Sequence, residues 1–433
     1  MNNLRFILDN RRFLGFGLLL AFASSFGQTF FIALFGAEIC TAFGLSHGGF
    51  GTVYSLATLT SALALVWLGR KIDDLDLRLY SALVCVGVVG ACFLMGMAAS
   101  VVLLALAIFL LRLTGQGLLG HTAATSMARY FGGQRGKAVS IASVGHSAGE
   151  ALLPLPAVLL IGALGWREAW LVIGTMLALV LVPLVLWLLK GHGERHRRLL
   201  EGADQGATDA ITTVRHWSRR EVLGDPWFYK VLPAVLAPPF ILTGLFFHQV
   251  HLAEVKGWSL TWLASCFVGF ATATVAASLF SGWLVDRLGA RRLLPYYLLP
   301  LGLALLLLAI LDHPAVALSY LILAGFTSGA SFAIVSALWA EAYGVIYLGA
   351  IRALVSALIV FSTALSPAVL GWLIDLDVSI ETVMAMGLGY VVVSITLVSL
   401  PMPAPPGPVT WEKKCGFAVP PAKRSWLAHL LRR

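Results

Sequence analysis

The chain has 433 residues, of which 59% are hydrophobic and only 12% are charged, and its mean hydropathy is +0.88. Soluble domains carry about 25% charged residues, so this composition excludes a soluble protein and indicates a polytopic membrane protein. The formal charge of +9 would suggest nucleic acid as the partner of a soluble chain. Here the positions of the charges along the chain explain it, and we expect no nucleic-acid partner.

The five cysteines are scattered, odd in number and without paired spacing, so we expect neither a disulfide framework nor a metal site, and no motif indicates a cofactor. The first apolar run, residues 13–36, is too long for the core of a signal peptide and lacks a convincing cleavage site. We therefore expect it to remain as a spanning helix.

Apolar runs of the roughly 20 residues needed to cross a bilayer predict an all-α membrane protein with twelve transmembrane helices. The predicted spans are 13–37, 48–69, 79–98, 101–128, 138–162, 168–190, 227–252, 259–285, 293–312, 314–342, 350–373 and 379–401.

Basic residues are unevenly distributed between the two sides of the membrane. The side that holds the N-terminus, the loops after the even-numbered spans and the C-terminal tail carries 26 of the 30 Lys and Arg residues. The opposite loops hold only Arg167 and Lys256. The positive-inside bias therefore predicts that both termini are cytoplasmic, and the short loops fit a bacterial inner membrane.

The chain divides into four predicted parts. An N-terminal six-helix half (1–190) is followed by a charged cytoplasmic linker (191–226), a C-terminal six-helix half (227–401) and a Pro-rich basic tail (402–433). The linker lacks apolar periodicity, so we predict a solvated connection between the two halves. The tail is either disordered or lies on the anionic inner leaflet.

An internal repeat relates the two halves. A constant offset of 213 residues aligns five Gly, Asp, Arg or Pro residues of the first half with identical residues of the second half. The pairs are Gly69 and Gly282, Asp73 and Asp286, Arg78 and Arg291, Gly136 and Gly349, and Pro154 and Pro367. Each half is therefore one structural unit used twice, an arrangement in which substrate binds between the halves near the membrane midplane.

Both copies of one loop read G-x-x-x-D-x-x-x-x-R, once as Gly69, Asp73 and Arg78 and once as Gly282, Asp286 and Arg291. This pattern resembles the cytoplasmic loop signature of the major facilitator superfamily, and the resemblance covers residues 13–401. The resemblance implies that Asp73 contacts the start of helix 11 and that Asp286 contacts the start of helix 5. Each carboxylate would there face a positive helix end and hold the cytoplasmic side closed. The alternative is that these charges only fix topology.

Arg112 and Gln116 lie in the fourth span, where Arg112-Leu113-Thr114-Gly115-Gln116 resembles a second signature of the superfamily. Arg112 falls about twelve residues into its helix, near the midplane. A guanidinium offers a bidentate fork to carboxylate or phosphate, so we interpret it as an anion-binding or proton-coupling group. The alternative is a structural ion pair with Glu150, because buried charges are commonly paired.

The region that follows carries Tyr130-Phe131, Arg135-Gly136-Lys137 and the glycines Gly145 and Gly149. It resembles monocarboxylate-transporter-like members of the superfamily, which implies proton symport of a monocarboxylate. In the first helix this chain has Gly27 and Gln28 where the eukaryotic monocarboxylate carriers have an Asp-Gly-rich signature.

Glu150 sits at nearly the depth of Arg112 in the fifth helix. The drug-proton antiporters of the superfamily carry Gly-Pro in this region, whereas here Glu150 follows Gly149 and the proline comes later, at Pro154. An anion that arrives at Arg112 would free Glu150 to take a proton, and this exchange would couple the two fluxes.

Other polar groups inside the spans are secondary candidates. Each of His121, His146 and His248 is a candidate proton relay or else a satisfied packing residue. Gln28 and Gln116 would each bind substrate or bridge helices.

Glu341 ends the tenth helix and Arg352 opens the eleventh, where we expect a gate pair or interfacial anchors. Pro238-Pro239 in the seventh helix acts as a hinge or a static kink.

The leading hypothesis is secondary active transport of a small, anionic organic solute by alternating access, driven by protons and carried out by a monomer. The alternative within transport is an exporter of a lipophilic or amphipathic compound. A non-transporting membrane sensor or an embedded enzyme is the third reading, but no HExxH or Walker motif occurs.

Overall fold

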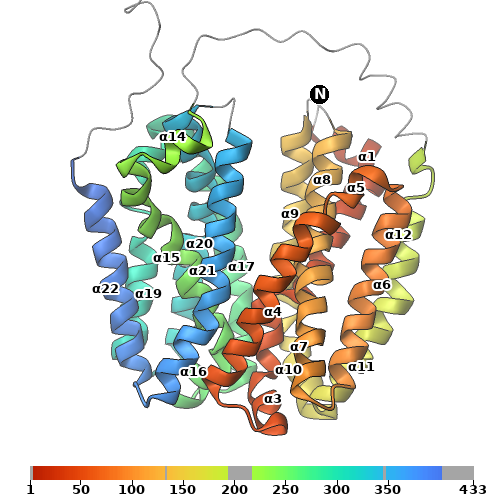
Figure 1. Ribbon diagram of the computed structural model, residues 1–433, viewed down its shortest axis with the longest axis horizontal. Coiled ribbons are helices and arrows are strands. Elements are labelled where there is room, and N and C mark those ends of the chain that lie inside the picture. Colours follow the sequence, from red (N-terminus) through yellow and green to blue (C-terminus); the bar gives the residue numbers. More distant parts are fainter. Residues whose placement is uncertain (1–2, 132–133, 194–216, 345–347, 402–433) are drawn as a thin grey trace, which may run out of the picture.

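The computed structural model describes residues 3–131, 134–193, 217–344 and 348–401. Within these ranges the regular elements are all helices, arranged side by side in two bundles (Figure 1). The expectations for most of the linker and for the Pro-rich tail fall on residues 194–216 and 402–433, outside the described residues.

The first bundle is built from residues 3–188. Its elements are α1 (Asn3–Ala23), η1 (Ser24–Gly27), α2 (Thr29–Ile32), η2 (Ala33–Phe35), α3 (Gly36–Phe43), α4 (His47–Leu68), α5 (Lys71–Asp74), α6 (Leu77–Gly96), α7 (Val101–Leu110), η3 (Leu111–Leu119), α8 (Gly120–Tyr130), α9 (Arg135–Leu152), α10 (Pro154–Leu164), α11 (Trp166–Met176), η5 (Leu177–Leu181) and α12 (Val182–Leu188). Of these, η3 and η5 are π-helical segments that continue the flanking α-helices without a break.

The second bundle is built from residues 219–399. Its elements are α14 (Arg219–Leu223), α15 (Pro226–Phe247), α16 (Gln249–Val255), α17 (Leu260–Leu288), α18 (Ala290–Leu293), α19 (Leu299–Ile310), α20 (Ala315–Tyr343), α21 (Leu348–Asp375) and α22 (Ile380–Ser399).

Each of the twelve predicted spans carries helix, but the spans differ in regularity. Nine described helices are long and apolar enough to cross a membrane, and two bent pairs raise the number to eleven. The remaining span, predicted over 293–312, keeps only the twelve-residue helix α19. Pro295 and Pro300 explain its shortness, because each removes a backbone donor and the helix restarts at Leu299.

Helix starts follow local sequence signals. Ser46, Asp76, Ser100, Ser259 and Ser379 each precede an apolar helix and accept a hydrogen bond from a backbone N–H of its first turn. These caps satisfy donors that have no partner inside the helix.

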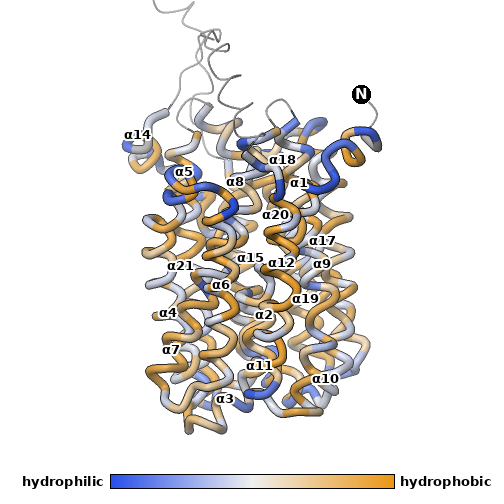
Figure 2. The backbone as a smooth tube through the Cα atoms, turned by 90° about the vertical axis from the view of Figure 1, so that its right-hand side faces the viewer, coloured by the Kyte–Doolittle hydropathy of each residue, from blue (hydrophilic) through white to orange (hydrophobic). Residues whose placement is uncertain are grey.

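The two ends of the molecule differ. At one end, the linker end, lie the described N-terminus, α5, α14 and α18, and polar residues concentrate there (Figures 1 and 2). At the opposite end, the far end, lie α3 and α16. The body between them is mainly apolar in Figure 2, as expected for a membrane-spanning region. That the linker end is cytoplasmic stays a prediction.

The bundles meet at the far end and diverge toward the linker end (Figure 1). At the far end, α4 of the first bundle packs on α21 of the second. A Cβ on Gly51 would lie 2.4 Å from the carbonyl oxygen of Pro367, and one on Gly371 would lie 2.5 Å from that of His47. These glycines bring the two backbones into direct contact, as small residues do between membrane helices.

Candidate functional site

A cavity of about 520 Å³ lies between the two halves. The first half contributes Gln28, Thr29, Phe30, Arg112, Gln116 and Glu150 to its wall. Four of the residues predicted from sequence, Arg112, Glu150, Gln28 and Gln116, are therefore brought together at one site. They come from three different helices of the fold.

A break in the first helix creates the polar part of the cavity. The chain leaves helical geometry at Gln28, which has φ −79° and ψ 154°, and the helices on either side are bent by 46°. Gly27 lies at this break, packed so closely on η3 that a Cβ would be 2.2 Å from the carbonyl oxygen of Leu111. Helix interruptions of this kind are tolerated in membranes where they line a cavity, since the freed backbone groups find other partners.

Arg112 is a hydrogen-bond partner for a backbone group that the break in the first helix leaves free. Its side chain, only 5% exposed, donates from Nη1 to the carbonyl oxygen of Gly27 (3.1 Å) and from Nε to Oγ1 of Thr58 (3.2 Å). The guanidinium also lies 5.3 Å from the ring centroid of Tyr54, whose hydroxyl donates to Thr29 (2.8 Å). All these partners are neutral. Arg112 projects from the π-helical segment η3, a type of irregularity often found at functional sites.

Glu150 lies on α9, with its side chain 13% exposed. Its Oε1 is 3.7 Å from Nε2 of His146, one helical turn away. Among the described residues no ion pair joins Glu150 to Arg112, so the alternative of a structural Arg112–Glu150 pair does not hold in this conformation. His146 does not line the cavity but stands beside a residue that does.

The second half covers the rest of the cavity with a different chemistry. Its lining consists of apolar and aromatic side chains, hydroxyl groups and a single charge. They are Val235, Pro238, Pro239, Leu242, Thr243, Phe246, Phe270, Ser328, Ser331, Phe332, Val335, Ser336, Trp339, Arg352, Val355, Ser356, Ile359 and Thr363. Sequence reasoning did not find this wall, because hydroxyl and aromatic residues in an apolar helix look like ordinary packing residues.

Arg352 lies in the first turns of α21, at the linker end of the cavity. It is exposed and donates from Nη2 to the carbonyl oxygen of Ser336 (2.7 Å). Glu341, its expected gate partner, instead accepts hydrogen bonds from the backbone N–H groups of Ala290 (2.8 Å) and Arg291 (3.4 Å) at the start of α18. Arg352 is thus a cavity residue, which the sequence did not indicate.

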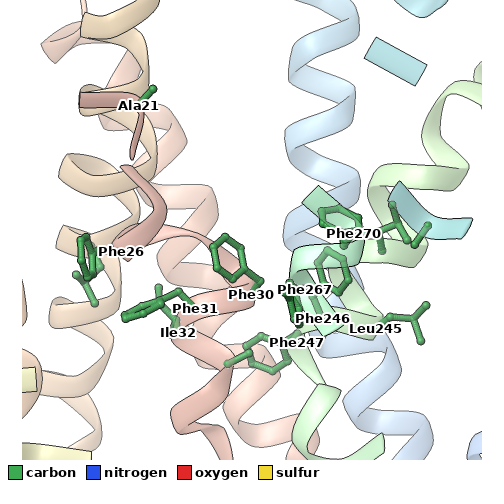
Figure 3. Packing of buried hydrophobic residues seen from close by; sticks show 14 of the residues in the cluster. Ala21, Phe26, Phe30, Phe31, Ile32, Leu245, Phe246, Phe247, Phe267 and Phe270 are labelled. Carbon is green, nitrogen blue, oxygen red and sulfur yellow. The ribbon is translucent and has the colours of Figure 1, made fainter. Parts of the chain in front are cut away.

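Aromatic side chains form the cavity floor toward the far end. Phe30 of the first half packs on Phe267 of the second, with ring centroids 5.8 Å apart, and Phe246 packs on Phe267 at 5.4 Å (Figure 3). Gln249 is fully buried and donates to the carbonyl oxygen of Phe30 (2.6 Å). This layer separates the cavity from the far end.

Two of the predicted histidines lie away from the cavity. His121 has its Nε2 3.2 Å from the carbonyl oxygen of Gly69, at the end of α4. His248 has its Nε2 3.0 Å from the carbonyl oxygen of Pro367, between α15 and α21 at the far end. Pro238 and Pro239 line the cavity inside α15, which continues through them to Phe247.

The repeated loop motif adopts different structures in the two halves. Asp73 forms an ion pair with Arg129 of its own half, and its implied contact with the start of α21 stays a prediction. Gly282 and Asp286 lie within α17, and among the described residues nothing is within 4 Å of a Cβ on Gly282.

The remaining motif arginines sit at the helix starts that follow these loops. Arg78 lies in the first turn of α6, and Arg291 lies in α18, where its Nη2 donates to the carbonyl oxygen of Glu341 (3.2 Å).

Comparisons with known proteins agree with this geometry. The model of the family described as the Major Facilitator Superfamily matches residues 17–273 and 251–433. A search of curated proteins found no match.

Two solved structures of a bacterial homologue of the human lysosomal transporter Spinster resemble the chain. One, inward-facing and occupied, has a TM-score of 0.67 at 16% identity and is aligned over 90% of this chain and 96% of its own. The other, inward-facing and unoccupied, has a TM-score of 0.63 at 14% identity, over 90% and 95%.

Proposed function

The chain belongs to the major facilitator superfamily of membrane transporters, and on this premise we propose that it moves an organic anion with an apolar body across the membrane by alternating access, coupled to protons. The transporter fold supports secondary transport in general. The substrate and the coupling are inferred from the cavity, and the cytoplasmic orientation of the linker end from the distribution of basic residues.

The observation that carries the proposal is the guanidinium of Arg112, which is buried at the cavity and whose partners among the described residues are all neutral. A buried charge without a counter-charge is costly, and an anionic substrate would supply the missing carboxylate or phosphate. Hydrogen bonds to charged groups contribute about 1.5–3 kcal/mol each, enough to make Arg112 the main determinant of affinity for the anion.

The uneven cavity wall supports an apolar body on that anion. The polar and charged side chains Gln28, Arg112, Gln116 and Glu150 come from the first half. The second half offers mainly aromatic and aliphatic surface with scattered hydroxyls, and its charge, Arg352, lies at the linker end of the cavity. A ligand fits both walls if its anionic group faces the first half and its apolar part the second. A volume of about 520 Å³ is that of a site for drug-sized molecules. This favours a larger substrate than a short-chain monocarboxylate.

The pair of Glu150 and His146 supports proton coupling. An anion in the cavity favours the protonated form of the nearby carboxyl group, because two like charges in one desolvated site repel. Proton binding at Glu150 would therefore accompany binding of the anion, and both would leave together when the cavity opens to the other side.

Transport in proteoliposomes tests the proposal. We would measure uptake of a series of ω-phenylalkanoates driven by a pH gradient, for wild type and for Arg112→Gln, Glu150→Gln and Arg167→Gln. Arg167 is the matched control, because it lies at the far end, where it donates to the carbonyl oxygen of Ala98 (2.9 Å). We expect uptake to be lost in the Arg112 variant, retained in the Arg167 variant, and retained without dependence on the pH gradient in the Glu150 variant.

Other outcomes would favour the remaining readings. Uptake of uncharged or cationic lipophiles that ignores Arg112→Gln would favour an exporter of lipophilic compounds, for which the aromatic wall of the second half is the supporting observation. Binding without transport would favour a sensor. Monomeric state and location in a bacterial inner membrane stay predictions.

A further inference from the structure

Three histidines that do not line the cavity lie close together at the far end, where the two halves touch. His47 is the first residue of α4 in the first half. His248 caps α15 and His251 lies in α16, both in the second half. The ring centroid of His47 is 4.6 Å from that of His251 and 5.9 Å from that of His248. The imidazoles thus face one another across the boundary between the halves.

The surrounding contact is tight and connects backbone with backbone. Oδ2 of Asp375, the last residue of α21, accepts a hydrogen bond from the backbone N–H of Gly48 (2.9 Å), so the second half caps a helix of the first. A Cβ on Gly48 would lie 2.3 Å from the ring of Trp372. Such a contact leaves little room for water to enter between the halves while they are closed.

Every element packed here adds a titratable group. α4 brings His47, α15 brings His248, and α16 brings His251 together with Glu254. In addition, α21 brings Asp375, and α3 brings Cys40, whose thiol is near enough to interact with Asp375. Among the described residues no three such groups are arranged to hold a metal ion.

We propose that His47, His248 and His251 form a proton-binding site separate from the cavity, and that protonation of this site from the far side opens the far end. His47 and His251 are partly exposed at this surface, so protons from that side reach them directly. Two imidazolium rings with centroids 4.6 Å apart would repel across the boundary. A cation on His47 would also face the positive N-terminal end of α4.

The direction of the effect follows from linkage. In the closed form His251 packs against His47, so a positive charge on both rings is unfavourable, while the carboxylate of Glu254 in the same helix favours a charge on His251. A group that binds protons weakly in the closed form and more strongly when solvated shifts the equilibrium toward the open form as the pH falls. Asp375 is the counter-charge that limits this shift, because its carboxylate attracts a positive charge on His248.

The inference rests on alternating access, as the proposed function does, but on no particular substrate. It can therefore be tested with empty protein. If far-end opening fails to respond to pH, the histidine site is wrong while anion transport through Arg112 stands. If transport fails, the pH response of the empty protein still decides the inference.

Distances between spin labels provide the test. With the five cysteines replaced, one pair of labels would be placed at the far end on the exposed residues Met97 and Leu311, and a second pair at the linker end on Leu75 and Leu288. Electron–electron double resonance in nanodiscs would follow both pairs between pH 8 and pH 5. We expect the far-end distances to lengthen and the linker-end distances to shorten, with a midpoint below about 6.5, the ordinary histidine pKa.

Variants separate this site from the cavity. His47→Gln together with His251→Gln should abolish the response. His251→Lys places a permanent cation beside the positive N-terminal end of α4 and should lengthen the far-end distance already at pH 8. The control His313→Gln, an exposed far-end histidine outside the cluster, should respond like wild type. If the glutamine pair does not fold, His251→Lys decides alone.

Two results would overturn the inference. One is a far-end distance that is the same at pH 8 and pH 5 in wild type. The other is a response that survives in the double histidine variant, or an alkaline distance unchanged by His251→Lys.

Discussion

Replacing Gly27 by alanine should damage the anion site without changing any polar side chain. A Cβ on Gly27 would lie 2.2 Å from the carbonyl oxygen of Leu111 and 2.5 Å from the backbone nitrogen of Gln116. Ordinary contact begins near 3.4 Å, so the broken first helix and η3 must separate by about 1.2 Å. Both obstacles are backbone atoms and cannot rotate away.

The magnitude follows from overpacking and from the position of Arg112. Overpacking of this kind costs about 1–3 kcal/mol. The carbonyl that accepts the hydrogen bond from Arg112 belongs to Gly27 itself, so it moves with the displaced backbone. At 1.36 kcal/mol per factor of ten, a loss of about 1–3 kcal/mol weakens anion binding by roughly 5- to 150-fold.

Isothermal titration and thermal melting of the purified protein would measure both effects. Gly120→Ala is the matched control, because Gly120 directly follows η3 and has no atom within 4 Å of its Cβ. We expect the control to bind like wild type and to be stabilised by at most about 1 kcal/mol. If Gly27→Ala bound the anion and melted like wild type, the close packing of the break on η3 would not position Arg112.

Two further predictions concern other parts of the chain. The Lys256 ammonium, 1% exposed, lies 2.5 Å from a carboxylate oxygen of Asp312 and 2.8 Å from one of Glu381. Lys256→Met should lower the free energy of unfolding by about 1–3 kcal/mol. This figure is already reduced for solvent screening, because both carboxylates are substantially exposed. Burial acts to lower the pKa of Lys256, but the two carboxylates outweigh burial and raise this pKa. The stabilisation is therefore complete below about pH 10.5 and is lost only as the pH rises through the folded-state pKa. Melting temperatures measured from pH 6 to pH 11 would check this. Arg352→Gln should weaken anion binding from the linker end several-fold and leave uptake from the far side unchanged, which a comparison of right-side-out and inside-out vesicles would measure.

Charges in apolar helices could be predicted from sequence to lie between the two halves, while their roles in binding and coupling stay predictions. Arg112 and Glu150 both line the cavity, because a charge at this depth is unfavourable against lipid and turns toward the protein interior. Helix positions were also predictable, because an apolar run that spans the membrane must have the length of the hydrocarbon core. The family signatures in the loops pointed to the correct superfamily.

Features that depend on packing between distant segments could not be predicted. The break at Gly27 and Gln28 has no proline to mark it and arises from close contact with η3, more than 80 residues away. His47 and His251 look like isolated polar residues near helix ends until α4 and α16 are placed side by side. Asp73 illustrates a third limit, since nothing in the loop motif indicated its ion pair with Arg129 of the same half.

Equilibrium binding of matched ligand pairs tests the central claim most directly. Each ω-phenylalkanoate would be compared with its carboxamide, which has the same apolar body without the charge, on wild type, Arg112→Gln and the control Arg167→Gln. We predict that wild type and the control prefer the carboxylate by about tenfold or more, and that Arg112→Gln removes this preference. Equal binding of carboxylate and carboxamide to wild type, or a preference that survives in Arg112→Gln, would contradict the account.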